Sequence, residues 1–232
     1  MGLAVRVIPT LLAKGTRLVK GKRFSADRIV GHVQQAARVH QARGVDELII
    51  LDVEATPKGR GPNFDAIRAL TEDCFMPLTV GGGVRTMDDI ERLLKAGADK
   101  VAIKTCLQLG WDASKRFGSQ AIVAVMDELP PYHLVDDVAR MCQDMGYGEI
   151  ILTAIEREGT MDGYDLGLIS TVSAAVTIPV IAHGGCSGPE DMLAAIRAGA
   201  SAVAAGALFQ FTDHTPMSCA RWLSQRGVET RL

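Results

Sequence analysis

Residues 78–105 contain a complete strand–turn–helix–strand pattern, and this pattern constrains the fold of the whole chain. A short apolar run after Pro77 predicts a strand, and the glycines at 81–83 allow a tight turn with positive φ. Thr86 suits a helix N-cap, apolar residues follow at helical spacing, and a second strand begins at Lys100. Such a βαβ unit almost always connects parallel strands by a right-handed crossover.

The same unit recurs later in the chain at a constant offset of 102 residues. The glycine pair at 82–83 corresponds to the pair at 184–185. The same offset aligns Glu47, which begins the segment ELIILDVE, with Glu149, which begins EIILTAIE. Two separate segments that share one offset predict an internal duplication rather than chance pairs of glycines.

Length and composition fit a single domain of one architecture. The chain has 232 residues, of which 47% are hydrophobic, so it can bury a large core. Alternating strand and helix patterns at this length are typical of a (β/α)₈ barrel, the TIM barrel. We therefore predict one α/β domain over residues 1–232, built from half-barrels at about 1–118 and 119–232. The polar run 14–28 is predicted to be a long loop, followed by a first helix over 27–42.

Charge and cysteine usage argue against several classes of function. The formal net charge is −2 and no basic run stands out, so nucleic acid is not expected as the main partner. The five cysteines form no CxxC pair, and no metal site or cofactor is predicted. No signal peptide or apolar stretch of membrane-spanning length is present. We expect a reduced, cytoplasmic protein without a membrane partner.

The duplicated glycine turns predict two anion sites at one end of the barrel. In such barrels the loops after the strands carry the chemistry, and glycine turns there direct backbone N–H groups at phosphate. Two sites on opposite sides of one mouth would suit a small molecule phosphorylated at both ends; alternatively, the glycines only make tight turns. The candidate residues of the two sites are Gly82, Gly83 and Thr105, and Gly159, Gly184, Gly185, Gly206 and Ala207.

Several segments resemble the cyclase subunit of imidazole glycerol phosphate synthase. The resemblance runs nearly end to end, and VGGGVRT and EREGTMDGYDL are its most specific segments; the others include VIPTLLAKGTRLVKGKRF, DELIILDVEAT, RFGSQAIVAVMD and IPVIAHGG. It implies a barrel that takes ammonia from a glutaminase (glutamine amidotransferase) subunit. In that family the ammonia splits and cyclises a doubly phosphorylated ribonucleotide, which agrees with the two expected phosphate sites.

The family's catalytic pair is only half present. The resemblance places the second of its two aspartates at Asp127, but the first falls on Leu12, which cannot transfer a proton. Each general acid or base typically contributes about 10²–10⁴-fold, so ordinary cyclisation should be badly impaired. Glu158 stands where the family has aspartate, and Lys104 where it has asparagine. The candidate catalytic residues are Asp127, Lys20, Asp52 and Glu158.

Four charged residues begin four of the predicted strands, at the end of the barrel opposite the mouth. They are Arg6, Glu47, Lys100 and Glu149. Alternating charges inside a barrel need to pair, so we predict an inward-pointing ring of ion pairs. The resemblance implies that this ring is an ammonia gate, and that Asp46 and Asp99 lie on the face that docks the glutaminase.

Three interpretations of function follow. The preferred one is a divergent relative that accepts ammonia for another substrate. The segment IPTLL resembles a branch of the family that has leucine at the position of Leu12 and occurs in bacterial surface-polysaccharide pathways. That resemblance implies a supply of ammonia for amidination of a sugar nucleotide. The second is an authentic histidine-pathway cyclase that uses Asp127 together with Glu158 or Lys104. The third is a scaffold without catalysis that activates a glutaminase partner.

Overall fold

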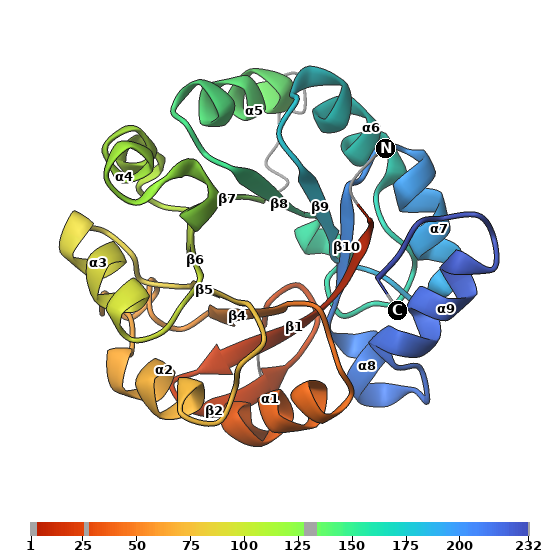
Figure 1. Cartoon of the computed structure of the whole chain (residues 1–232), viewed down its shortest axis with the longest axis horizontal. Coiled ribbons are helices and arrows are strands. Elements are labelled where there is room, and N and C mark those ends of the chain that lie inside the picture. Colours follow the sequence, from red (N-terminus) through yellow and green to blue (C-terminus); the bar gives the residue numbers. More distant parts are fainter. Residues whose placement is uncertain (1–3, 26–27, 128–133, 232) are drawn as a thin grey trace.

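The parallel strands of the chain close into a barrel, which confirms the predicted architecture (Figure 1). The computed structural model describes residues 4–25, 28–127 and 134–231. β1 pairs in parallel with both β4 and β10, and these two pairings close the sheet. Within the described residues the barrel strands are β1 (Arg6–Lys14), β4 (Leu48–Asp52), β5 (Leu78–Gly81), β6 (Lys100–Ile103), β7 (Ile122–Asp127), β8 (Glu149–Thr153), β9 (Val180–His183) and β10 (Ala202–Ala205).

Helices surround the barrel on its outer side (Figure 1). Thr86 caps the helix α3 as predicted, and the cap is reciprocal: its hydroxyl accepts from the Asp89 N–H at 3.1 Å, while the Asp89 carboxylate accepts from the Thr86 N–H at 3.0 Å. The helices are α1 (Val33–Ala42), α2 (Phe64–Thr71), α3 (Met87–Lys95), α4 (Gly110–Phe117), α5 (Val135–Asp144), α6 (Leu166–Ala175), α7 (Pro189–Arg197), α8 (Ala207–Phe211) and α9 (Pro216–Ser224). The short α8 was not predicted.

The segment expected to be a long loop after the first strand is instead largely a hairpin, so that prediction was wrong. β2 (Arg17–Lys20) and β3 (Arg28–His32) extend the sheet beyond β1 in antiparallel pairing. The cause is that both faces of β2 are buried: Leu18 packs in the larger hydrophobic cluster, and Val19, which points to the opposite face, packs in the smaller one. The first helix accordingly begins at Val33 rather than near position 27, which itself lies outside the described residues.

Two hydrophobic clusters hold the fold together. The larger one lies between the strands and the surrounding helices, and the smaller one fills the barrel interior. The alternation of side chains along each strand produces this division, because successive residues point to opposite faces. Leu12 belongs to the interior cluster and is fully buried there, beside its register partners Val19 and Leu51.

Candidate functional site

A cavity of about 390 Å³ opens at the carboxyl ends of β4 to β7. It brings together residues that were predicted from different parts of the chain: Gly82 and Gly83 after β5, Thr105 after β6, and Asp127 at the end of β7. Lys104 joins them, and Phe24 and Val53 supply part of an apolar wall. The cavity therefore combines polar groups at one end with an apolar surface.

The turn after β5 requires glycine at two consecutive positions. Gly82 and Gly83 have φ values of +111° and +75°, which side chains disfavour. A Cβ atom at Gly83 would lie 2.7 Å from the carbonyl oxygen of Arg60, so the turn is also too crowded for one. The N–H of Gly83 donates to no other described residue and is free to meet an anion.

Asp127 and Lys104 form an ion pair at the edge of this cavity. The Asp127 side chain is buried, whereas the Lys104 side chain is 55% exposed. The pair gives the cavity one carboxylate and one ammonium group in contact. Leu12 lies within the barrel interior and adds no proton-transfer group where the resemblance expects the first aspartate.

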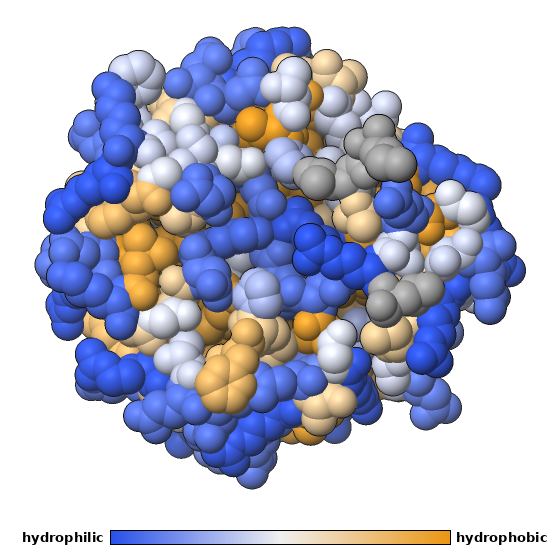
Figure 2. Space-filling model, viewed as in Figure 1, coloured by the Kyte–Doolittle hydropathy of each residue, from blue (hydrophilic) through white to orange (hydrophobic). Residues whose placement is uncertain are grey.

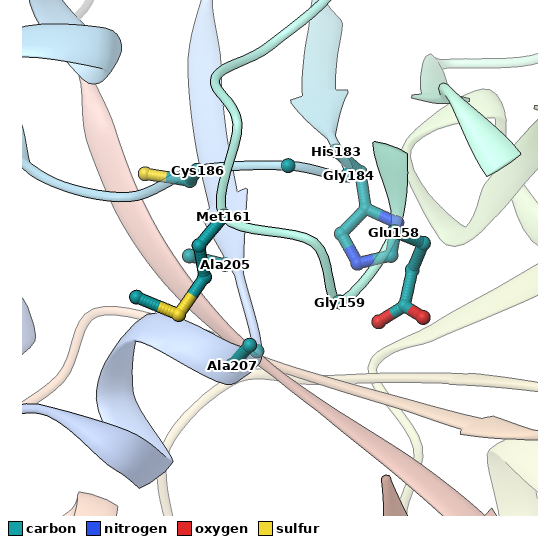
Figure 3. Close-up of a pocket in the computed structure, with 10 residues that line it drawn as sticks. Glu158, Gly159, Met161, His183, Gly184, Cys186, Ala205 and Ala207 are labelled. Carbon is teal, nitrogen blue, oxygen red and sulfur yellow. The ribbon is translucent and has the colours of Figure 1, made fainter. Parts of the chain in front are cut away.

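A second pocket lies across the mouth and contains the other predicted anion residues (Figure 3). Its volume is only about 10 Å³. Figure 3 shows the His183 ring and the Glu158 side chain at one end, and the Met161 side chain extending toward Ala207. The lining residues are Glu158, Gly159, Met161, His183, Gly184, Gly185, Cys186, Ala205, Gly206 and Ala207.

Lys20 and Glu158 form a buried pair beneath the second pocket. The Lys20 Nζ lies 3.9 Å from a Glu158 carboxylate oxygen and has no hydrogen-bond partner among the described residues. Burial lowers the pKa of Lys20, although the charge of Glu158 opposes this shift. Burial likewise raises the pKa of Glu158 against the opposing charge of Lys20. Both shifts favour the neutral forms, and such forms suit proton transfer.

His183 is both packed and part of the pocket lining. Its Nδ1 lies 3.2 Å from the hydroxyl of Thr153, and its ring is buried. Burial lowers the pKa of His183 to about 3, with a further contribution from the charge of Lys20. The imidazole is therefore neutral at physiological pH.

Asp52, a candidate catalytic residue, is engaged by its own loop. Arg60 donates to both carboxylate oxygens, at 2.9 and 2.7 Å. The N–H groups of Glu54 and Ala55 each donate to one of these oxygens at 3.1 Å. These bonds order the loop after β4, which lines the cavity. Sequence reasoning did not single out Arg60, because the pairing depends on how the loop folds back.

At the opposite end of the barrel, the four predicted charges form a closed ring of ion pairs. Arg6 contacts Glu47 at 2.6 Å and Glu149 at 2.9 Å, and Lys100 contacts the same two carboxylates at 3.0 and 3.1 Å. Thr79 adds a 2.8 Å hydrogen bond to Glu47. The predicted pairing of these side chains is confirmed, and Figure 2 shows hydrophilic residues across the centre of the barrel.

The two acids expected on a docking face lie near this ring. Asp46 precedes Glu47 and is partly buried, which raises its pKa. Asp99 precedes Lys100, and its carboxylate accepts a 2.8 Å hydrogen bond from the Leu78 N–H. Asp99 thus also orders the start of β5. Contact with a partner stays a prediction for both residues.

The described residues hold no group of three or more His, Cys, Asp or Glu side chains that could bind a metal ion. In the same part of the chain, every helix is too short or too polar to cross a membrane.

Comparison with known proteins identifies the family. Residues 6–215 match the family model described as "Histidine biosynthesis protein". The chain is 41% identical over 257 residues to "Imidazole glycerol phosphate synthase subunit HisF" of Mycobacterium bovis, covering 99% of this chain and 96% of that protein. It is 38% identical over 251 residues to "Putative imidazole glycerol phosphate synthase subunit hisF2" of Campylobacter jejuni, covering 99% of both. The chain therefore belongs to the histidine biosynthesis protein family, as one of its HisF-like barrels.

Proposed function

We propose that this barrel is the ammonia-accepting subunit of a glutamine amidotransferase complex and that its acceptor is not the histidine intermediate. The observation that carries the proposal is Leu12, a buried leucine where the resemblance expects a catalytic acid. A general acid or base at that place contributes about 10²–10⁴-fold, and leucine supplies neither. The acceptor chemistry we favour is amidination of a sugar nucleotide for a surface polysaccharide.

The ring of Arg6, Glu47, Lys100 and Glu149 supports the part of this proposal that concerns ammonia. Apolar side chains alone could close the barrel floor. Four buried or half-buried charges cost desolvation free energy, and their ion pairs only offset this cost, so the charges are not explained by stability alone. We interpret the ring as the entry for ammonia from a glutaminase docked over Asp46 and Asp99. The relatives are named as subunits of a synthase, which supports a partner chain for this barrel.

Enzyme assays on the purified chain test this proposal. With saturating ammonium, conversion of the histidine intermediate should be at least about 100-fold slower than by a HisF relative measured alongside. A rate within tenfold of that relative would refute the proposal. Leu12→Asp should raise any residual rate of this conversion if the other residues at the carboxyl end of the barrel can support catalysis.

A second set of assays identifies the ammonia route and the acceptor. The chain is mixed with its glutaminase, ¹⁵N-amide glutamine and nucleotide-activated sugars, and the products are analysed by mass spectrometry. Incorporation of ¹⁵N into a sugar nucleotide is the expected result. Lys100→Met should lower the ratio of glutamine-driven to ammonium-driven product. An unchanged ratio would remove the support for entry through the ring.

A second candidate function is an authentic histidine-pathway cyclase. The contact between Lys104 and Asp127 at the cavity favours it, because a lysine beside a carboxylate offers an alternative acid–base pair. Under this candidate, Lys104→Met would abolish turnover of the histidine intermediate. Under the main proposal that turnover is already very low in the wild type.

A further inference from the structure

The C-terminal segment of the chain lies at the floor end of the barrel, beside the start of β1 (Figure 1). α9 ends at Ser224, and the chain turns at Gly227, whose φ is +82°. The Val228 N–H then donates to the carbonyl oxygen of Leu223 at 3.2 Å. We call residues 228–231, which follow this turn, the C-terminal strap.

The strap pairs with the backbone just before β1. Val5 and Thr230 form a parallel bridge, and the Val5 N–H donates to the carbonyl oxygen of Glu229 at 2.7 Å. The Thr230 hydroxyl in turn donates to the carbonyl oxygen of Ala220 at 3.1 Å, which ties the strap to α9. The strap thus joins the last helix to the residue that precedes Arg6.

The strap supports the part of β1 that β4 does not reach. β1 pairs with β10 from Arg6 onward, but its pairing with β4 begins only at Thr10. The strands of a closed barrel are staggered, so the first residues of one strand can extend beyond a neighbour. The hydrogen bond from Val5 to the strap therefore holds the chain next to a stretch that β4 leaves unpaired.

Arg6 depends on this backbone for its two contacts in the ring. Its Nη1 lies 2.6 Å from Glu47 and its Nη2 lies 2.9 Å from Glu149, so one planar guanidinium group bridges two carboxylates. Such a fork holds both partners only in a narrow range of orientations. A shift of the Arg6 backbone would therefore weaken both contacts, whereas Lys100 reaches the same carboxylates from β6.

A second feature places the strap beside the ring. Arg231 lines a small cavity together with Val7 and Asp46. Burial raises the pKa of Asp46, and the charge of Arg231 opposes this rise. The strap thus lies beside both segments that carry ring residues at this point, the start of β1 with Arg6 and the start of β4 with Glu47.

We propose that the C-terminal strap is a positioning element of the ring: by holding the backbone at Val5, it fixes the orientation in which Arg6 joins Glu47 and Glu149. The geometry of the barrel floor is then set by the last residues of the chain as well as by the barrel strands. The consequence for ammonia entry rests on the proposed function, whereas the positioning of Arg6 does not.

Titration of the carboxyl groups by NMR, on the purified chain without glutaminase, tests the positioning. Burial raises the pKa of Glu47, but the charges of Lys100 and Arg6 outweigh burial and lower it. Deletion of residues 228–232 should raise this pKa by at least half of the rise that Arg6→Met produces. Thr230→Val keeps the shape of the side chain, loses its hydrogen bond to α9 and should raise the pKa by a smaller amount.

A destabilising variant away from the strap is the control. Leu93 is fully buried on α3, so Leu93→Ala should lower the urea midpoint without changing the pKa of Glu47. If the deletion variant does not fold by circular dichroism, Thr230→Val decides the question. An unchanged pKa of Glu47 in the folded strap variants, or an equal rise in Leu93→Ala, would overturn the inference.

Assays with the glutaminase test the consequence for ammonia. Deletion of the strap should lower the ratio of glutamine-driven to ammonium-driven product, as expected also for Lys100→Met. Arg226→Met removes an exposed cation just before the strap and should leave this ratio unchanged. If the pKa of Glu47 rises as expected but the wild type transfers no ammonia, the proposed function fails and the inference stands. If ammonia is transferred and the strap variants change neither the pKa nor the ratio, the inference alone fails.

Discussion

Replacing Lys100 by methionine removes one cation from the ring at the barrel floor. Lys100 contacts two carboxylates, and Glu47, the more buried of them, has a side chain only 3% exposed. Methionine keeps most of the apolar length of lysine, so the main change is electrostatic. Glu47 would then keep Arg6 and Thr79 as partners, and Glu149 would keep Arg6.

The expected loss of stability follows from burial and from the partners that remain. Removing one member of a buried ion pair typically costs about 3–5 kcal/mol. Arg6 still compensates both carboxylates, and the Lys100 side chain is 17% exposed, so the floor can admit water. We therefore expect the free energy of unfolding to fall by about 2–3 kcal/mol, below the usual range for a fully buried pair.

The pH dependence of this loss identifies its cause. Burial alone raises the pKa of Glu47, but Lys100 and Arg6 outweigh burial and hold the pKa below its ordinary value of 4.5. Such a group stabilises the fold above that value, and its contribution is lost as the pH falls through the lower folded-state pKa. Without Lys100 the carboxyl group binds a proton more readily. The difference between wild type and variant should therefore shrink as the pH falls from 7 to below 4.5.

Urea denaturation at several pH values measures both effects, with Lys95→Met as the matched control. Lys95 also pairs with a glutamate, at 2.6 Å, but its side chain is 74% exposed. Exposed pairs of this kind contribute about 0.2–1 kcal/mol. If Lys100→Met costs no more than Lys95→Met at pH 7, or if its cost does not change with pH, the ring does not stabilise the barrel in the way argued.

Three further changes test other parts of the structure. Thr86→Ala should lower the free energy of unfolding by about 1 kcal/mol because α3 loses its cap, whereas Thr86→Ser should keep most of it; equal urea midpoints would contradict this. Burial gives His183 a pKa of about 3, so the folded protein binds fewer protons than the unfolded chain below pH 6.5 and loses stability as the pH falls toward 3. His183→Gln should flatten that decline in pH-dependent melting, and an unchanged slope would exclude His183 as its source. Gly83→Ala places a side chain at φ +75° against Arg60, so it should cost more than about 1 kcal/mol and weaken phosphate binding in calorimetry; unaltered affinity would argue against the turn as the site.

Much of the barrel could be predicted because its signals are local and repeated. The cap at Thr86, the glycine turn and the apolar strands each depend on a few neighbouring residues, and the duplicated unit made chance agreement improbable. The ring at the floor could also be predicted, because charges at strand starts inside a barrel must find partners. The hairpin after β1 was missed, since the polar residues around them concealed the two apolar side chains that β2 buries.

The size of each anion pocket could not be predicted, because it depends on contacts between segments far apart in the chain. The sequence shows that Gly159 and Gly206 are glycines, but only the folded chain shows that the hairpin at Lys20 and Gly21 packs against both. The hydrogen bonds between Arg60 and Asp52 are a similar case. A carboxylate at the end of a barrel strand predicts a catalytic role, and only the folded loop shows that both of its oxygens accept hydrogen bonds from Arg60.

Leu12 and the ion-pair ring at the barrel floor bear on two different steps of the proposed function. A cyclase for a doubly phosphorylated substrate needs an acid at the end of β1 and room for a phosphate at each end of the mouth. Here Leu12, near the end of β1, packs into the barrel interior, and the hairpin that continues from β1 packs against Gly159 and Gly206. The β1 segment thus lacks the expected proton-transfer group, while the floor ring, on other strands except for Arg6, keeps all of its ion pairs. That combination supports the proposal that the barrel receives ammonia and passes it to an acceptor other than the histidine intermediate.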